Sequence, residues 1–499
     1  MNITKKNQNQ HPAASTPRTT ISIKEKIGYG LGDTASNFYW QMFMSFILFF
    51  YTDVFGISAA AAGTLLLVTR IWDTGIDPLM GIMADRTDTR WGKFRPYLIW
   101  MAIPIGIIGV LAFTTPDLST TGKIIYAYVT LTLLMAAYSA INTPYSALMG
   151  VLTSNSLERT SISSYRFVLA FVAAFIVQGT TLPLVQFFGK GNQAIGFQWT
   201  MAVFSLAAVV LFFVTFLTTK ERIRPPVNQK TSLKNDVSDL MHNRPWMVLF
   251  FIGIFVLSYN SIRSGSIIYY FKYYVGNTDL TSTFMMSGTV AVIIGVMTTK
   301  YLSKIWGKKK LYMSLMGIVS ILTSAFYFIP KENIALIFAL HVIISLLLAP
   351  TAPLIWAMYA DTADYSEWKF GRRATGLIFS AATFAQKFGW AIGGAITGWL
   401  LAYYGFVANT AQAEGTQDGI RLMMSIIPAA GSILATLTIA FYNLDEPLME
   451  KIEKELLRRK ENDSRNTPDG KRDNSDESTS HSDDTKPRIN INGSNEQLA

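Results

Sequence analysis

The 499-residue chain lacks cysteine and contains few histidines and few charged residues. Without cysteine it forms no disulfide, thiolate metal site or cysteine nucleophile. Its four histidines are scattered (His11, His242, His341 and His481), so we expect no metal centre. Charged residues make up 15% of the chain and hydrophobic residues 50%, and the apolar residues fall in long blocks. This composition favours a chain embedded in a lipid bilayer over a soluble protein.

Twelve apolar blocks are long enough for transmembrane helices, which need about 20 mostly apolar residues each. They lie near 27–52, 58–84, 97–115, 123–150, 161–187, 196–218, 246–273, 279–303, 311–329, 334–361, 374–404 and 420–443. We therefore predict an all-α integral membrane protein with twelve transmembrane helices in two six-helix halves. The expected domains are a polar tail (1–23), an N-terminal bundle (24–219), a cytoplasmic central loop (220–245), a C-terminal bundle (246–445) and a cytoplasmic, largely disordered tail (446–499).

The net charge of +10 comes from lysines and arginines that gather in every second loop. The basic loops lie at 85–96, 220–244, 300–310 and 369–373, whereas the alternate loops are nearly bare of cations. Basic loops of membrane proteins stay in the cytoplasm, so both termini are predicted to be cytoplasmic. The first 23 residues have no apolar core and are not a signal peptide. We expect a bacterial plasma-membrane protein in contact with lipid, with no nucleic-acid partner.

A short basic motif occurs twice, as WGKFRPY at 91–97 and as WGKKKLY at 306–312. The first copy follows the second predicted helix and the second copy follows the eighth. Equivalent turns in two six-helix halves are typical of transporters with internal repeats.

Charged residues inside the apolar blocks are the main functional signal, because each costs at least ~2.5–3.5 kcal/mol by insertion scales. Asp73 and Asp77 are four residues apart and share a helix face, where their mutual repulsion favours binding of a cation or a proton. Lys387 lies far from either end of its block and needs an acid or an anionic ligand. The alternative for Lys387 is that it reaches to the membrane surface. Arg263 is either part of a structural ion pair or a partner for an anionic substrate.

Other polar residues of the blocks have weaker signals. Asp33 and Asn37 are again four apart, although Asp33 could cap its helix at the membrane surface. Asn142 precedes Pro144, which frees a backbone carbonyl, but this polarity could equally serve helix packing. Trp390, one turn after Lys387, offers a ring that can stack on the C–H face of a sugar.

These motifs resemble those of the glycoside–pentoside–hexuronide:cation symporters. The resemblance is carried by RIWDTGIDP at 70–78, TRWGKFRP at 89–96, YTDVFG at 51–56, NTP at 142–144, YRF at 165–167, DTADYSE at 361–367 and Lys387. It covers residues 24–445 and implies the major facilitator fold, with alternating access to a central cavity.

The resemblance also implies roles for individual residues, which we combine with the reading of the charges above. The cation site is expected to contain Asp73, Asp77, Asn142 and Ser139. The sugar site is expected to contain Asp33, Asn37, Trp40, Tyr138, Arg166, Arg263, Gln386 and Trp390. Lys387 and Arg70 would couple the two sites. A cytoplasmic latch between the halves would use Arg90, Lys93, Arg95, Asp361, Asp364, Arg372 and Arg373.

The chain departs from the melibiose-carrier branch of the family at two positions. Asn37 and Asn142 stand where that branch has acids that help to bind a galactosyl group and sodium. The pattern is closer to the xyloside and glucuronide branches, which are commonly proton-coupled. We therefore expect proton-coupled uptake of a pentoside or a hexuronide without a cofactor, and sodium coupling stays open. The alternatives are a lysolipid carrier of the same fold and a sugar sensor that does not transport. A membrane-embedded enzyme is disfavoured, because no nucleophile or metal site accompanies the acid pair.

Overall fold

The computed structural model describes residues 21–153, 155–223, 238, 240–371 and 375–466. The N-terminal bundle contains α1 (Ile23–Phe49), which continues as the π-helical segment η1 (Phe50–Phe55), then α2 (Ala59–Arg86), α3 (Arg95–Trp100), α4 (Ala102–Ala112), α5 (Thr120–Leu152), α6 (Ser156–Gly189) and α7 (Gln193–Thr218). The C-terminal bundle contains α9 (Arg244–Tyr269) with the π-helical η2 (Tyr270–Val275), α10 (Leu280–Trp306), α11 (Lys308–Ala325) with the short η3 (Phe326–Phe328), α12 (Ile334–Leu348), α13 (Thr351–Phe370), α14 (Thr375–Tyr403), α15 (Glu414–Met424) and α16 (Ile426–Ile439).

Each of the twelve predicted blocks contains helix, and three of the blocks contain a break. Proline accounts for the break between α12 and α13, where Pro350 can donate no backbone hydrogen bond. Ser425 separates α15 from α16 with a non-helical backbone, and Met101 separates α3 from α4. Several helices begin with a side-chain cap: Ser58 accepts from the N–H of Ala61, for example. The breaks shorten helices without changing the predicted order.

Eight helical segments of the described chain are long and apolar enough to cross a membrane. Helices α1, α2 and α14 are also long, with 27, 28 and 29 residues, but they are not among the eight. These three carry Asp33, Asp73 and Lys387, which are part of the candidate site.

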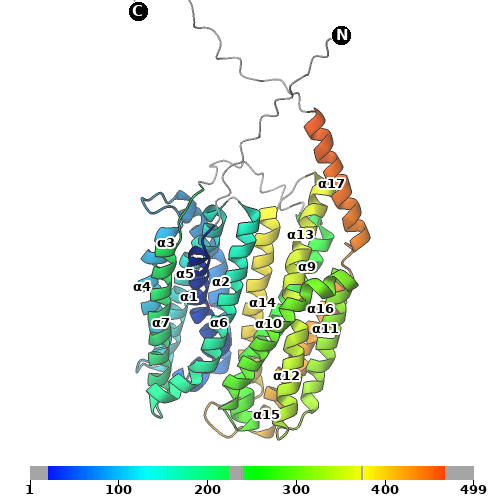
Figure 1. The fold of residues 1–499 in the computed structure, drawn as a ribbon. Coiled ribbons are helices and arrows are strands. Elements are labelled where there is room, and N and C mark those ends of the chain that lie inside the picture. Colours follow the sequence, from blue (N-terminus) through cyan, green and yellow to red (C-terminus); the bar gives the residue numbers. More distant parts are fainter. Residues whose placement is uncertain (1–20, 154, 224–237, 239, 372–374, 467–499) are drawn as a thin grey trace, which may run out of the picture. The chain divides into compact units, whose positions relative to one another are not determined.

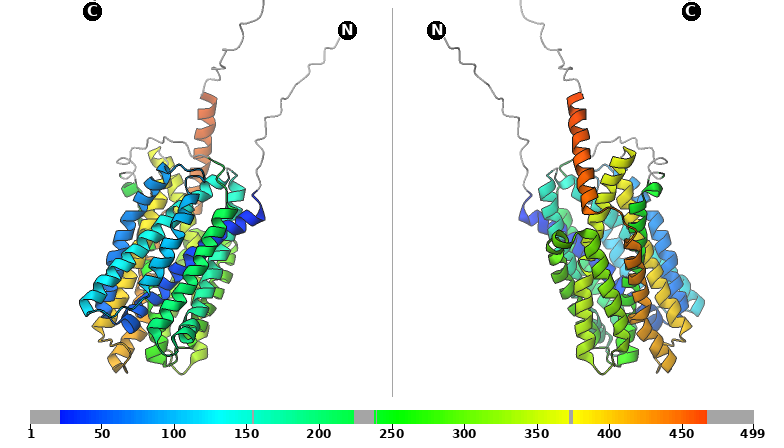
Figure 2. Two further views of the ribbon diagram at one scale, coloured as in Figure 1. Left: turned by 90° about the vertical axis from the view of Figure 1, so that its left-hand side faces the viewer. Right: turned by 90° about the vertical axis from the view of Figure 1, so that its right-hand side faces the viewer.

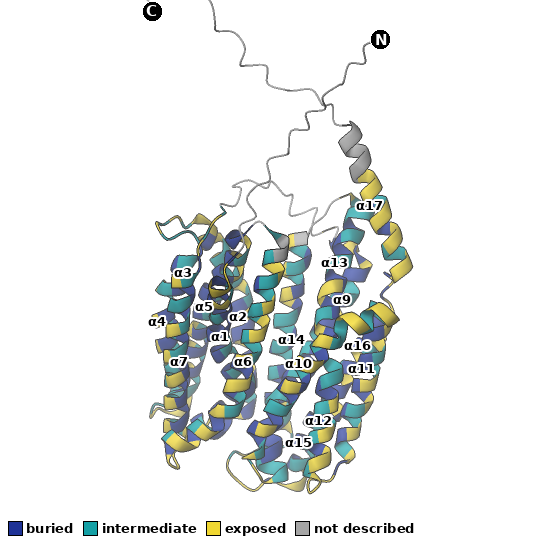
Figure 3. Ribbon diagram, viewed as in Figure 1, coloured by how far each residue is buried: buried dark blue, intermediate teal, exposed yellow. Residues whose placement is uncertain are grey.

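The two bundles lie side by side in Figure 1, and both belong to one compact unit that ends at Ile452. The bundles meet along α2 with α14 and along α6 with α10, while α1 packs on α6 and α7, and α9 packs on α14 and α16. The side views in Figure 2 show the helices of both bundles lying along roughly one common axis. Exposed residues gather on the outer faces of the helices in Figure 3. This arrangement leaves α2 and α14 to build the middle of the unit.

Glycines allow α2 and α14 to approach very closely at the end away from the basic loops, which we call the extracellular end. A Cβ atom on Gly398 would lie 2.6 Å from the carbonyl oxygen of Ala59, and one on Gly63 would lie 2.8 Å from that of Ala395. Both neighbours are backbone atoms that cannot rotate away. The two bundles are therefore in backbone contact at their extracellular end.

The predicted disorder of the C-terminal tail does not extend to its first part. Residues Glu446–Asn466 form α17, because this stretch is rich in Glu, Lys, Leu and Arg, which favour helix, and has Glu446 in its first turn. Residues 467–499 lie outside the described part of the chain, as do 1–20 and most of the central loop.

Candidate functional site

Lys387 of α14 bridges the two acids of α2 and so joins the bundles. Its Nζ atom lies 2.9 Å from Oδ2 of Asp73 and also contacts the carboxylate of Asp77. Ser139 of α5 donates to Oδ1 of Asp73 at 2.6 Å. The Asp73 side chain is 1% exposed, whereas that of Asp77 is 30% exposed. Asp73 is thus held by partners from several helices, and Asp77 is the more exposed of the two acids.

Arg70 supplies a second cation to this cluster. Its Nη1 atom lies 3.5 Å from Oδ2 of Asp73, and the residue is 2% exposed. The guanidinium carbon lies 4.6 Å from the ring centre of Trp40 and 4.2 Å from that of Phe43, so aromatic faces stabilise its charge. Two cations therefore face two carboxylates. We call Arg70, Asp73, Asp77 and Lys387 the central cluster.

A second ion pair lies on α1 and α6 of the N-terminal bundle. Nη2 of Arg166 is 3.2 Å from Oδ1 of Asp33, and the guanidinium also lies 5.4 Å from the ring centre of Tyr145. Tyr145 stacks on Tyr29 with ring centres 4.6 Å apart, and each hydroxyl donates to the other residue's carbonyl oxygen. The two tyrosines thus fix the position of the ring beside which Arg166 lies. Asp33 therefore acts as an ion-pair partner inside the bundle rather than as a cap at the membrane surface.

The two asparagines that replace acids contact their own helices. Asn37 donates to the carbonyl oxygen of Asp33 at 2.9 Å, and Asn142 donates to that of Tyr138 at 3.1 Å. Among the hydrogen bonds of the described residues, neither amide contacts the central cluster, whereas Ser139 does. A role for Asn37 and Asn142 in ligand binding stays a prediction.

An aromatic wall connects three helices beside the central cluster. Trp40 of α1 stacks on Tyr138 of α5 with ring centres 5.8 Å apart, and it meets the edge of Trp390 of α14 at 6.3 Å. Trp390 and Arg70 both line a cavity of about 20 Å³ between the bundles. That volume is too small for a sugar, so this wall is closed in the present conformation.

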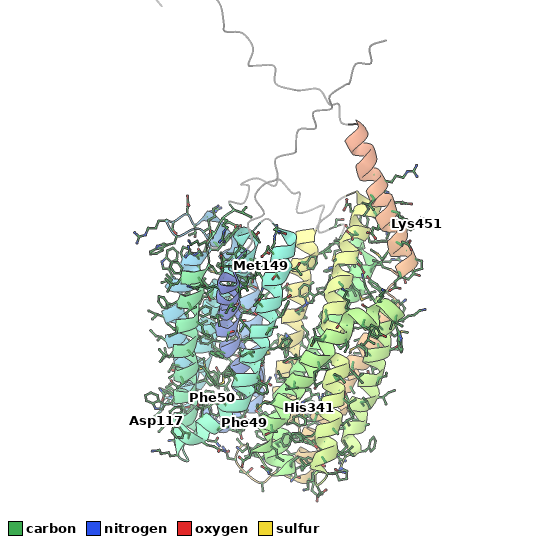
Figure 4. All side chains as sticks on the ribbon, in the orientation of Figure 1. Phe49, Phe50, Asp117, Met149, His341 and Lys451 are labelled. Carbon is green, nitrogen blue, oxygen red and sulfur yellow. The ribbon has the colours of Figure 1, made fainter. Side chains whose placement is uncertain are left out.

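Two predicted sugar-site residues lie elsewhere. Gln386 lines a cavity of about 300 Å³ together with Phe171, Tyr312 and Trp356. Arg263 of α9 lines a different cavity of about 150 Å³, next to His341 of α12, which Figure 4 labels. The structure thus brings Asp73, Asp77, Ser139, Arg70, Lys387, Trp40, Tyr138 and Trp390 together. Gln386 and Arg263 line other cavities, and the cavity at Arg263 shares Ser45 with the cavity at Trp390.

Four residues of the predicted latch, Arg90, Lys93, Arg95 and Asp361, contact their own bundles. Arg95 donates to the carbonyl oxygen of Phe216 at 2.6 Å, and the backbone N–H groups of Lys93 and Arg95 donate to Glu221. Lys308 forms an ion pair with Asp361 at 2.6 Å. The guanidinium of Arg90 lies over the ring of Trp91, and Asp364 follows Asp361 one turn later on α13. Arg372 and Arg373 lie outside the described residues, so a latch between the halves stays a prediction.

A charged cluster at the extracellular end was not predicted from the sequence. Lys272 of η2 lies 2.7 Å from Oδ1 of Asp53 of η1, and Tyr273 also donates to that oxygen. Asn409 donates to the Asp53 carbonyl and accepts from Lys272. Asp53, Lys272, Tyr273 and Asn409, which we call the extracellular cluster, close this end across the two bundles. The available signal was position: Asp53 and Lys272 end the first and seventh helices of the repeat.

Comparison with known proteins places this geometry in context. Residues 28–446 match the family model described as MFS/sugar transport protein. The chain is 38% identical over 442 residues to an inner-membrane symporter of Escherichia coli strain K12, covering 88% of this chain and 96% of that protein. It is 36% identical to the isoprimeverose transporter of Lactiplantibacillus pentosus, covering 89% and 93%. It is 31% identical to a glucuronide carrier protein homologue of Escherichia coli strain K12, covering 88% and 96%.

Among solved structures, the fold is similar to that of a D-xylose–proton symporter. The TM-score is 0.61 at 14% sequence identity, and the match covers 84% of this chain and 96% of the other.

Proposed function

The chain belongs to the MFS/sugar transport protein family, and on that premise we propose that it couples uptake of a pentoside or hexuronide to inward movement of a proton. The predicted resemblance to the glycoside–pentoside–hexuronide:cation symporters is confirmed, and the relatives are transporters rather than enzymes. The family and the relatives therefore support sugar:cation symport across the bacterial cell membrane. The identities of the coupling ion and of the sugar class are what we propose.

The observation that carries the proposal is the bridge from Lys387 to Asp73 and Asp77. It is an ion pair between the two bundles at the place where α2 meets α14. A proton taken up by Asp77 removes one negative charge and weakens the hold on Lys387. The bundles can then rearrange, so protonation changes the conformational equilibrium that a sugar between the bundles also shifts. Such coupling is reciprocal between the two ligands.

The charge balance of the central cluster favours a proton over sodium. Arg70 and Lys387 already neutralise both carboxylates, so an additional metal cation would meet two positive charges nearby. A proton instead forms a covalent bond to a carboxylate and needs no set of oxygen ligands.

The aromatic wall and the Asp33–Arg166 pair support a polar substrate. Trp40, Tyr138 and Trp390 offer ring faces for the C–H groups of a sugar, and Asp33 with Arg166 offers hydrogen-bond acceptors and donors on the same side. Opening the wall would expose these groups to one compartment at a time.

The test is tracer uptake into right-side-out membrane vesicles with an imposed pH gradient or an imposed sodium gradient. We expect accumulation of labelled xyloside or glucuronide with the pH gradient alone, and none in the Asp77→Asn variant at equal expression. Exchange of internal for external sugar should persist in that variant. Sodium-driven accumulation at constant pH would refute the proton assignment. Binding without any transport would indicate a sensor, and uptake of lysolipid instead of sugar would refute the substrate class.

A further inference from the structure

Arg263 is a buried cation without an acidic partner among the described residues. The other buried cations of the helical core have one: Lys387 and Arg70 contact Asp73, Arg166 contacts Asp33, and Lys272 contacts Asp53. Arg263 is only 6% exposed, in the last third of α9, which continues directly into η2. A buried charge without a counter-charge is costly in a membrane protein, and such residues mark binding sites and ion pathways.

The neighbours of Arg263 are neutral groups that satisfy it poorly. Nη1 lies 3.5 Å from the hydroxyl of Tyr259, and Nη2 lies 3.4 Å from Nδ1 of His341. The ring of Phe326 lies 5.5 Å from the guanidinium carbon, and Nε has no hydrogen-bond partner in the described structure. These long contacts orient the guanidinium but leave its charge and part of its donor capacity unused.

The guanidinium faces a cavity of about 150 Å³, which is roomy enough for a small polar group together with water. The polar lining of this cavity comes from both bundles. Gln178 lies on α6, and the hydroxyl of Thr289 on α10 donates to the side-chain oxygen of Gln178 at 2.6 Å. The remaining polar residues of the lining are Ser45, Asn260, Ser264 and Ser345. Their hydroxyl and amide groups suit an oxygen-rich ligand. Because α1 and α6 of the other bundle contribute, a ligand here would contact both halves of the molecule.

The charges of the surrounding groups also favour an anion. The central cluster has two cations and two carboxylates, and the pair Asp33–Arg166 is balanced, so Arg263 leaves this region with one uncompensated positive charge. A positive site in a low-dielectric cleft attracts a monoanion.

We propose that this cavity binds the carboxylate of an acidic sugar, with Arg263 as its counter-ion. The inference rests on the proposed function and narrows it: hexuronides are the substrates, and neutral pentosides lack the group that this site requires. Arg263 would then be the residue that selects between acidic and neutral sugars, separate from the coupling residues Asp73, Asp77 and Lys387.

The test compares a uronide with its neutral counterpart on purified carrier in lipid nanodiscs. Binding of methyl β-glucuronide and of methyl β-glucoside is measured by calorimetry, next to gradient-driven uptake of both in vesicles. We expect a preference for the glucuronide of roughly 10- to 100-fold, as is usual for a charge-assisted hydrogen bond, and loss of that preference in Arg263→Gln. Arg263→Lys should restore part of it. Arg421→Gln, which alters an arginine on α15 beside Tyr327, is the matched control and should keep the preference.

A second variant and a second ligand make the result decisive. Ser264→Leu keeps the charge of Arg263 but fills the cavity, and it should weaken glucuronide binding while the protein stays folded. Arg263→Gln should not lower the melting temperature of the ligand-free protein, because it removes an unpaired buried charge. Sodium acetate serves as a free carboxylate. If acetate raises the melting temperature of the protein equally with and without methyl β-glucoside, the cavity holds an anion that is independent of the sugar, and the sugar assignment is overturned.

The failures of the two proposals differ. Proton-driven uptake of both sugars with equal affinity, unchanged in Arg263→Gln, would overturn the inference and leave sugar symport intact. Binding of neither sugar, with proton-driven uptake of labelled xyloside intact, would overturn the inference alone, and the absence of xyloside uptake as well would overturn both.

Discussion

Removal of Lys387 tests how the central cluster links protonation to transport. In Lys387→Ala, the buried carboxylate of Asp73 keeps only the hydroxyl of Ser139 at 2.6 Å and the guanidinium of Arg70 at 3.5 Å. Removing one partner of a buried ion pair costs about 3–5 kcal/mol, and the 18% exposure of the lysine side chain places this site near the lower value. About 3 kcal/mol corresponds to a factor of roughly 100 in an equilibrium constant.

The protein can avoid that cost by keeping a proton on one of the two acids. An acid that stays protonated in every conformation no longer responds to the pH gradient. We therefore expect Lys387→Ala to lose uphill accumulation and to bind sugar more weakly, while residual exchange of internal for external sugar continues. Lys387→Arg keeps the charge but changes its shape, so it should be partly active. Vesicle uptake and sugar exchange, measured side by side, separate these two activities.

A double variant distinguishes loss of charge balance from loss of the lysine itself. Lys387→Ala combined with Asp77→Asn again balances the cluster, so its melting temperature should exceed that of Lys387→Ala alone, while accumulation stays absent. Lys309→Ala is the control, because this half-buried lysine of α11 contacts only a backbone carbonyl among the hydrogen bonds described. Normal accumulation in Lys387→Ala, with unchanged sugar affinity and proton dependence, would refute the reasoning and indicate that the lysine reaches the membrane surface instead.

Two further predictions concern the closed extracellular end. Because the chain has no native cysteine, both use one reporter cysteine, Ser261→Cys, in the cavity of about 20 Å³ that Arg70 and Trp390 line. Gly398→Val should force α2 away from α14, because its Cβ would overlap the backbone of Ala59. The rate at which an impermeant thiol reagent labels the Ser261→Cys reporter should then rise several-fold. Gly415→Val is the control, because the space around Gly415 is open. Asp53→Asn should weaken the extracellular cluster and raise the same labelling rate by a factor of about 5 to 100, in line with the ~1–3 kcal/mol of a charge-assisted hydrogen bond. Labelling at the parental rate in either variant would contradict the corresponding contact.

The sequence predicted the elements whose signal lies within one helix. Long apolar blocks predicted most helix ends to within about six residues, although α13 ends at Phe370 rather than near residue 361. The spacing of Asp73 and Asp77 placed both acids on one face. Lys387 could be proposed as their partner, because a charge in mid-helix needs one. A contact between distant helices leaves no such mark: the placement of Arg70 between Trp40 and Phe43, and the hydrogen bond from Ser139, required the packed structure.

His341 shows the limit most clearly. A single histidine in the apolar run of α12 has no periodic or motif signal, and the four histidines are scattered along the chain. Only the fold brings His341 to 3.4 Å from Arg263. Asp53 belongs to the YTDVFG motif, but its partner Lys272 lies 219 residues away, and the two meet only where the two helix ends come together.

The distance along the chain between Lys387 and the α2 acids has a consequence for biosynthesis. Asp73 precedes Lys387 by 314 residues, and chains are synthesised at about 5–20 residues per second. Helix α2 is therefore made roughly 15 to 60 s before Lys387, the second of the two cations that balance its acids. During that interval Arg70 of the same helix balances only one of the acids, so the other must be protonated or shielded by water or by the insertion machinery. A chain truncated before α14 would keep that acid in this state, so the chain should be recognised by membrane proteases as unfinished.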